Sequence, residues 1–301
     1  MAFHLKQLTD NPSRTTSRHR SKRPPITRRE AKARAARLLT DGRISATQQR
    51  VLASLAVAGV LSEAQLHRLL GVSGRSLRRY QQRHLLDRLY IFPPKLQALG
   101  LENGYPRLYK LGQVGLAIAQ HDQAQVPSGY EGFGVHKLTH DVLANELLLR
   151  VTLAAVDRGF DPIWLNKYEA TVHDDSGRAT LEPDGMLVLR HERDATRRIL
   201  LEYHNEDDGR RTAEKVRRYE EAIRDGHWRR AWNCDAFPTI LISWSHNAVA
   251  TGYQEAIAQQ HHRHLGLRGR YLGMPITRLL AGADPLLWKS FHQSEVVDLL
   301  A

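Results

Sequence analysis

The stretch LEPDGMLVLRHERDATRRILLEYHNEDDGRRTAEKVRRY, residues 181–219, decides how the second half of this chain folds. Two apolar runs, 186–189 and 199–203, flank a charged turn, and this pattern is typical of a β-hairpin. Asp184 stands just before the first apolar run, and Glu202 lies inside the second. Because side chains on paired strands meet across the ladder, we expect these two acids to lie close together.

The acid pair has the chemistry of a divalent-cation site. Carboxylates on neighbouring strands can bind Mg²⁺ or Mn²⁺ through oxygen, and such a cation can activate water for attack on a phosphodiester. The spacing follows the PD…(D/E)xK pattern of nucleases, with His204 where an active enzyme usually has its lysine. Lys215, on the helix that follows, is the candidate substitute. The catalytic candidates are Asp184, Glu202 and Lys215, and the metal-ligand candidates are Asp184, Glu202 and Glu146.

The alternative to a metal site is a structural hairpin. A Pro-Asp-Gly turn and one acid on a polar strand face follow from turn chemistry alone. Glu202 favours the functional interpretation, because an acid inside an apolar strand conflicts with local preference and such conflicts tend to mark function.

Composition limits the possible classes of protein. The chain has 301 residues, of which 42% are hydrophobic and 25% charged, enough for two modest domains. It has no apolar run near the roughly 18 residues of a transmembrane helix and no apolar signal-peptide core at its start, so we expect a cytoplasmic protein without a membrane partner. The single cysteine, Cys234, excludes an internal disulfide.

Positive charge is concentrated at the N-terminus. Residues 1–44 hold twelve Lys and Arg against three acids, so they carry +9 of the net charge of +12. We predict a basic disordered arm over 1–44, within which 27–39 can form a helix. Such an arm gains affinity for nucleic acid by releasing counterions from phosphates, and Arg28 and Arg29 are its candidate contacts. A solubilising tail is the alternative.

The pattern over 45–120 is that of a winged helix-turn-helix domain. Apolar residues recur at helical spacing before Gly59, and Ser62 caps a second helix over 63–70. A tight turn at 71–73 leads to a third helix, predicted over 74–86. Strands are expected at 90–92 and 107–111, joined by a wing around 102–106. A closing helix follows.

The third helix occupies the recognition position of a helix-turn-helix. Its polar side chains can contact phosphates or base edges, and two further basic residues come from the strand after the wing. The DNA-binding candidates in this domain are Arg75, Ser76, Arg78, Arg79, Gln82, Arg83, Arg107 and Lys110.

A linker is expected over 121–135 and a second domain over 136–301. Its elements, in order, are a helix at 137–158, a strand at 163–172, the hairpin, a helix at 211–224, a strand at 237–244, a helix at 247–264 and a strand at 270–277. This αβββαβ order is the layout of the restriction-endonuclease fold. The predicted fold class is therefore α+β, a winged helix followed by a PD-(D/E)xK nuclease-like domain.

The chain resembles a known family through a series of short motifs over roughly 45–290. After the winged helix these are His140-Asp141, Asn145-Glu146, Trp164, Glu169, Pro183-Asp184-Gly185, Leu201-Glu202, Lys215 with Tyr219, and the apolar strand at 237–241. In this order they resemble the replication-relaxation proteins of plasmids and integrative elements. The family's pattern of Glu-x-Asp followed by Gly-Thr is replaced here by Glu202-Tyr203-His204.

The resemblance implies a bacterial DNA-binding accessory, associated with a nucleoid or plasmid, that acts in replication or transfer of a mobile element. Its expected partners are double-stranded DNA and a relaxase or replication initiator, with a homodimer as a further option. DNA binding would require no cofactor. One alternative is a metal-dependent DNA nickase or endonuclease that uses Asp184 and Glu202 with Mg²⁺ or Mn²⁺. A transcriptional regulator is the other.

Overall fold

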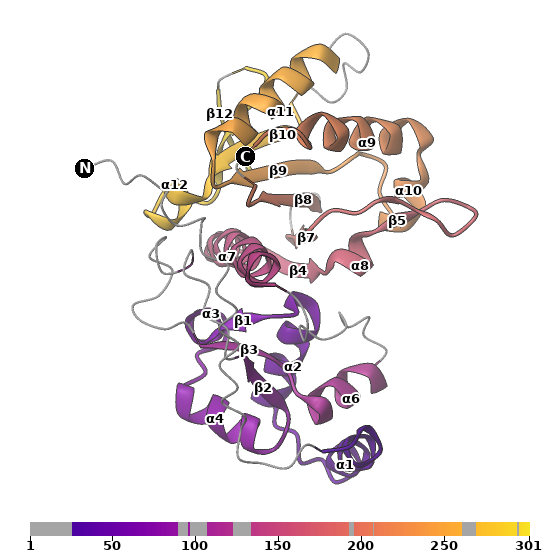
Figure 1. Ribbon diagram of the computed structural model, residues 1–301, viewed down its shortest axis with the longest axis vertical. Helices are drawn as coiled ribbons and strands as arrows, with labels where there is room; N and C mark the ends of the chain where they lie inside the picture. Colours follow the sequence, from indigo (N-terminus) through magenta and orange to yellow (C-terminus); the bar gives the residue numbers. More distant parts are fainter. Residues whose placement is uncertain are drawn as a thin grey trace.

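The computed structural model describes residues 26–89, 96, 107–122, 134–192, 196–206, 208–260, 269–293 and 295–301. A small sheet with its helices forms the N-terminal part, residues 26–122, and a large sheet forms the C-terminal part, residues 134–301 (Figure 1). Long helix α7 (Val135–Asp157) lies between the two. The α+β class predicted from the sequence is confirmed.

The first described helix is α1 (Arg28–Thr40). Thr27 and Glu30 form a capping box at its N-terminus. Ala31 and Ala35 are buried in the N-terminal core, and α1 packs against α6. The helix predicted over 27–39 is confirmed. The prediction of a disordered arm over 1–44 is wrong for residues 28–44, because Ala31 and Ala35 of α1, together with Ile44, are buried in the N-terminal core. Residues 1–25 lie outside the described residues.

Three further helices follow, each with a serine at its N-cap. They are α2 (Ala46–Ala58), α3 (Glu63–Leu70) and α4 (Gly74–Gln82). Gly71, with φ 67°, ends α3 in the left-handed conformation and turns the chain toward α4. The third helix ends four residues earlier than predicted, because His84 has φ 58° and the following residues enter a strand.

The small sheet is antiparallel, with the order β1-β3-β2. Its strands are β1 (Leu61–Ser62), β2 (Leu86–Leu89) and β3 (Leu108–Leu111), and α6 (Gln113–His121) follows. The strand predicted at 107–111 is confirmed. The strand predicted at 90–92 and the wing at 102–106 lie outside the described residues, as does most of the linker predicted at 121–135.

The large sheet has seven strands in the order β12-β11-β10-β9-β8-β7-β4. Its central elements follow α7 in the predicted αβββαβ order: β4 (Asp161–Leu165), β7 (Gly185–Arg190), β8 (Arg197–His204), α9 (Thr212–Asp225) and β9 (Thr239–Trp244). Strands β4, β7 and β8 are antiparallel neighbours, whereas β8 and β9 run parallel. A crossover through α9 makes that parallel pairing possible.

Several C-terminal elements differ from the predicted ones. The strand predicted at 163–172 ends at Leu165, because Asn166 caps the short helix α8 (Lys167–Ala170). Also not predicted from the sequence are the short elements β5 (Val172–His173), β6 (Ala179–Leu181), α10 (His227–Trp232), α12 (Ile276–Leu280), β11 (Leu287–Ser290) and β12 (Val296–Asp298). The predicted late helix and strand are α11 (Asn247–Gln260) and β10 (Tyr271–Pro275), and residues 261–268 lie outside the described residues.

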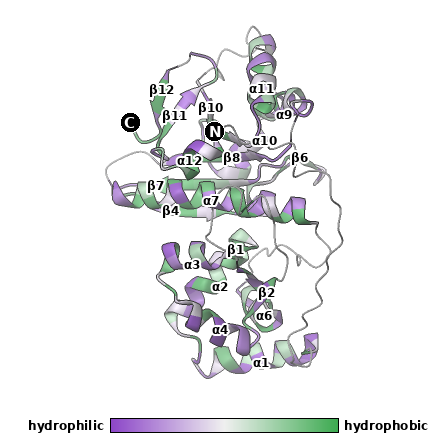
Figure 2. Cartoon of the chain, turned by 60° about the vertical axis from the view of Figure 1, so that its left-hand side comes forward, coloured by the Kyte–Doolittle hydropathy of each residue, from purple (hydrophilic) through white to green (hydrophobic). Residues whose placement is uncertain are grey.

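Both faces of the large sheet are covered. One face packs on α7, and Val60 and Leu108 of the N-terminal part join that core. The other face packs on α9, α10 and α11. In Figures 1 and 2, α1 and α4 lie at the end of the molecule away from the large sheet. Within the described ranges, no helix combines the length and apolar character needed to cross a membrane.

Candidate functional site

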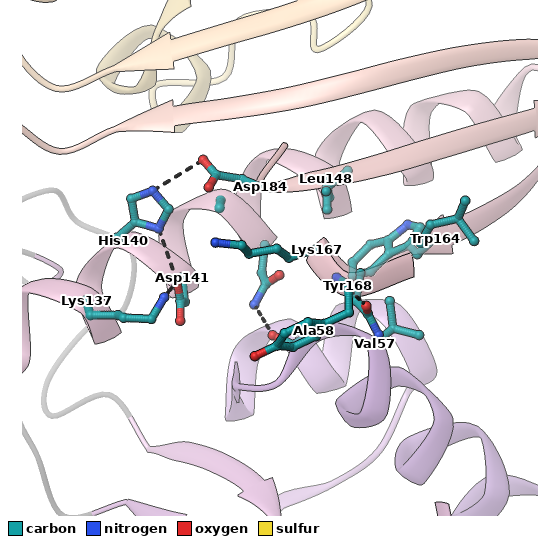
Figure 3. A pocket seen from close by; sticks show the side chains of 15 residues that line it. Val57, Ala58, Lys137, His140, Asp141, Leu148, Trp164, Lys167, Tyr168 and Asp184 are labelled. Atoms are coloured by element: carbon teal, nitrogen blue, oxygen red, sulfur yellow. Dashed lines mark hydrogen bonds and ion pairs between the residues drawn. The ribbon is translucent and has the colours of Figure 1, made fainter. Parts of the chain in front are cut away.

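Asp184 lies where the chain enters β7, and its carboxylate is held from two sides. The Tyr203 backbone N–H donates to Asp184 Oδ2 at 2.9 Å, and His140 Nε2 lies 3.3 Å from the same oxygen. His140 projects from α7, and its other ring nitrogen lies 3.1 Å from Asp141 Oδ1 (Figure 3). The hairpin and α7 together therefore position the first acid.

This contact makes His140 and Asp184 an ion pair. Burial alone would lower the pKa of His140, but the Asp184 carboxylate and the hydrogen bond with Asp141 outweigh it and raise that pKa to about 10. Burial alone would raise the pKa of Asp184, but the charged His140 and the Tyr203 N–H hold it far below its ordinary value. At neutral pH the imidazolium therefore neutralises the carboxylate.

Glu202 lies in the middle of the sheet on β8, with 1% of its side chain exposed. Lys215 Nζ, from α9, lies 2.9 Å from Glu202 Oε1 and 2.8 Å from Oε2, and the Tyr219 hydroxyl donates to Oε1 at 2.5 Å. Burial lowers the pKa of Lys215, but Glu202 and Asp184 outweigh it and raise that pKa above its ordinary value. Lys215 thus reaches back from the helix to the strand glutamate, as the sequence suggested.

The position that usually carries lysine is filled by a buried imidazole. His204 Nε2 lies 2.7 Å from the Tyr253 hydroxyl, and Nδ1 lies 3.3 Å from Glu206 Oε2. The hydrogen bond from His204 lowers the pKa of Glu206 to about 2. His204 is therefore engaged with α11 and the end of β8, while Lys215 supplies the cation at Glu202.

An open cleft of about 300 Å³ connects the two acids. Its lining mixes basic and acidic side chains: His136, Lys137, His140, Arg211 and Lys215, with Asp184, Glu202 and Glu206. A second pocket, of about 110 Å³, lies on the other side of His140 and reaches α2 (Figure 3). Trp164 and Tyr168 form its aromatic wall.

Asp184 and Glu202 both have partners among the chain's own residues. Both oxygens of Glu202 accept hydrogen bonds from Lys215, and Asp184 Oδ2 is engaged by Tyr203 and His140. Across the part of the chain that the structure describes, no three His, Cys, Asp or Glu side chains are grouped to hold a metal ion. The chain's own cations balance the two acids.

Glu146, the third candidate metal ligand, lies in a different place. Its side chain is fully buried between α7 and α3, where Arg68 Nη1 and Nη2 approach its two oxygens at 2.8 and 2.5 Å. Arg150 Nε donates at 2.7 Å and Gln65 Nε2 at 3.2 Å. Glu146 therefore joins the two parts of the molecule and is not brought to Asp184. Gln65 was not predicted from the sequence to have a role.

Most of the DNA-binding candidates lie on the surface. Arg75, Arg78, Arg79 and Gln82 on α4 are exposed, as are Arg28 and Arg29 at the start of α1. Ser76 and Arg83 are half-buried, and Arg107 is exposed but pairs with Glu63 at 3.2 Å. The prediction that Lys110 is a surface contact is corrected, because only 8% of this residue is exposed and its neighbours Leu108 and Tyr109 in β3 are buried too.

Comparison with known proteins gives one match. A family model described as replication-relaxation matches residues 52–235, from within α2 to just beyond α10, and so includes α4, Asp184, Glu202 and Lys215. The searches of curated proteins and of solved structures found no match.

Proposed function

The chain belongs to the replication-relaxation family, and we propose that it is a DNA-binding accessory protein that acts beside a relaxase or replication initiator. Family membership implies a role in the replication or relaxation of plasmids or mobile elements. The proposal that the protein binds duplex DNA rests chiefly on α4, which carries exposed arginines. This helix follows the capped helix α3 and the left-handed turn at Gly71.

We infer that the N-terminal part is a winged helix. The order of α2, α3 and α4 and the antiparallel sheet β1-β3-β2 support this. In such domains the helix after the turn enters the major groove, and its polar side chains contact base edges and phosphates. Arg75, Arg78 and Arg79 project from that helix into solvent.

The C-terminal part, in this proposal, has a nuclease-like layout used for binding or assembly. The αβββαβ order supports the layout. The ion pair of Asp184 with His140 supports a role other than cleavage, as does the buried His204 at the position that usually carries lysine.

Selection from a random pool of duplexes tests the DNA-binding role. The wild type should enrich a preferred sequence, and the double variant Arg78→Ala/Arg79→Ala should lose that preference. The matched control is Arg217→Ala/Arg218→Ala, which removes the same charge from exposed i,i+4 ion pairs on α9. An unchanged preference in the α4 variant would refute the assignment of α4 to base contact.

A metal-dependent nickase is the second candidate function. One observation favours it: Lys215 projects from α9 to Glu202, close to Asp184. Supercoiled plasmid incubated with Mg²⁺ or Mn²⁺ distinguishes the two functions. We expect no nicking and no Mn²⁺-dependent rise in melting temperature. Mn²⁺-dependent nicking that is lost in both Asp184→Ala and Glu202→Gln would replace the accessory role with the nickase.

A further inference from the structure

A basic groove lies between α1 and the C-terminal end of α4. It has a volume of about 470 Å³, and its lining residues are Arg34, Arg37, Leu38, Asp41, Arg43 and Arg83. Four arginines thus face one acid. Arg43 is the only one of the four with an acid partner among the described residues, Asp41 at 3.4 Å. The groove therefore carries a net positive charge next to the exposed face of α4.

The two walls of the groove are held in fixed relation. Buried Ala31 and Ala35 pack α1 onto the N-terminal core beside α6. Arg83, at the end of α4, donates to the Arg43 backbone carbonyl at 3.3 Å, which ties the chain after α1 to α4. Helix α1 is consequently part of the folded N-terminal part, and its arginines keep a defined distance from α4.

We propose that this groove, formed by Arg34, Arg37, Arg43 and Arg83, binds the sugar-phosphate backbone of the duplex whose bases α4 contacts. The inference rests on the proposed DNA-binding function and identifies a second contact surface for it. Guanidinium groups match phosphate oxygens in charge and in hydrogen-bond geometry. Elements that flank a recognition helix commonly contact the backbone and fix the register of the protein on DNA.

An acidic protein segment is the other ligand that such a groove could accept. DNA is favoured because Arg83, which lines the groove, is the C-cap residue of α4, and the exposed residues of that helix include Arg75, Arg78 and Arg79. Both surfaces also lie at the end of the molecule away from the large sheet (Figures 1 and 2). A duplex on α4 would therefore pass close to α1.

The test measures binding of the full chain to fluorescent duplexes at several salt concentrations. The probes are a mixed-sequence duplex and the duplex selected by the wild type. In Arg34→Ala/Arg37→Ala, the slope of log affinity against log salt should become less steep by about 2, since each lost phosphate contact contributes about 0.9. Affinity should fall roughly ten-fold or more for both duplexes, so that the preference between them is unchanged. The control is again Arg217→Ala/Arg218→Ala.

Each outcome decides the proposal. A slope and affinity equal to those of the control would overturn it, and so would a change in sequence preference without a change in slope. If Arg34→Ala/Arg37→Ala lowers the melting temperature, Arg37→Gln alone should give about half of the slope change. Failure of the wild type to bind either duplex would overturn the proposed function together with this inference. Retained binding with an unaltered slope would overturn the inference alone.

Discussion

Replacement of Glu146 by glutamine tests how the two parts of the molecule are joined. The buried carboxylate accepts hydrogen bonds from Gln65 and Arg68 on α3 and from Arg150 on α7. Arg150 also donates to the Leu279 carbonyl at 2.7 Å, so the network extends to α12. Glutamine keeps the size of the side chain but removes its charge and turns one acceptor oxygen into a donor that faces other donors.

The expected loss follows from burial. Breaking a buried ion pair by removing one partner costs about 3–5 kcal/mol. The Arg68 and Arg150 side chains are 34% and 26% exposed, so water can partly rehydrate them once the carboxylate is gone. We therefore expect the lower end of that range, about 3 kcal/mol.

The tryptophans of this chain permit a sharp assay. All five lie in the C-terminal part, and only Trp164 lines the pocket that reaches α2, so their fluorescence follows chiefly the C-terminal part. Far-ultraviolet circular dichroism follows the helices of both parts. In urea the two signals should change together in the wild type and separate in Glu146→Gln, with the helical signal lost first.

Glu214→Gln is the matched control. Glu214 forms an exposed i,i+4 pair with Arg218 on α9, and losing such a pair changes stability by about 0.5 kcal/mol or less. Coincident transitions in Glu146→Gln, with a loss no larger than that of the control, would refute the role of Glu146 in joining the two parts.

Two further predictions concern the acid pair. Because the pKa of His140 is raised from 6.5 to about 10, its pair with Asp184 stabilises the fold fully below pH 6.5 and loses that effect as pH rises toward 10. Between pH 6.5 and 10, the free energy of unfolding of the wild type should therefore fall by up to about 1.4 kcal/mol per pH unit more than that of His140→Gln. If the unfolding free energies of the two proteins change equally with pH, the prediction is contradicted. Lys215→Met should lower the free energy of unfolding, measured by chemical denaturation, by about 3–5 kcal/mol, because it leaves the Glu202 carboxylate buried without a cation. Adding Glu202→Gln to the same chain should restore most of the lost stability. Equal stabilities of wild type and Lys215→Met would show that the pair contributes nothing net.

Local chemistry in the sequence determined much of the fold. Ser62, three residues before Gln65, forms a capping box and begins α3 at the predicted residue. The apolar runs around the charged turn became β7 and β8, which brought Asp184 and Glu202 to one cleft. Lys215 was within reach of prediction because α9 follows β8 directly. Capping, periodicity and turn chemistry act between near neighbours, so they can be read from sequence.

Contacts between distant segments were decided only by the tertiary structure. Gln65 was not predicted to have a role, but its amide donates to Glu146, which the sequence suggested as a metal ligand. Lys110 appeared as a basic strand residue, but Leu108, Tyr109 and Lys110 are all buried, so both faces of β3 are covered by segments from elsewhere in the chain. The alanines of α1 gave no sign that the basic arm would dock on α6.

The sequence by itself therefore determined the longer helices, the hairpin and the presence of two acids near Lys215, whereas the short helices α8, α10 and α12 were not predicted. The tertiary structure decided which charges meet: Asp184 with His140, and Glu146 with Arg68. The physical reason is that the strength of an ion pair depends on burial and on separations of a few ångströms between distant segments, which are fixed only when the chain has packed.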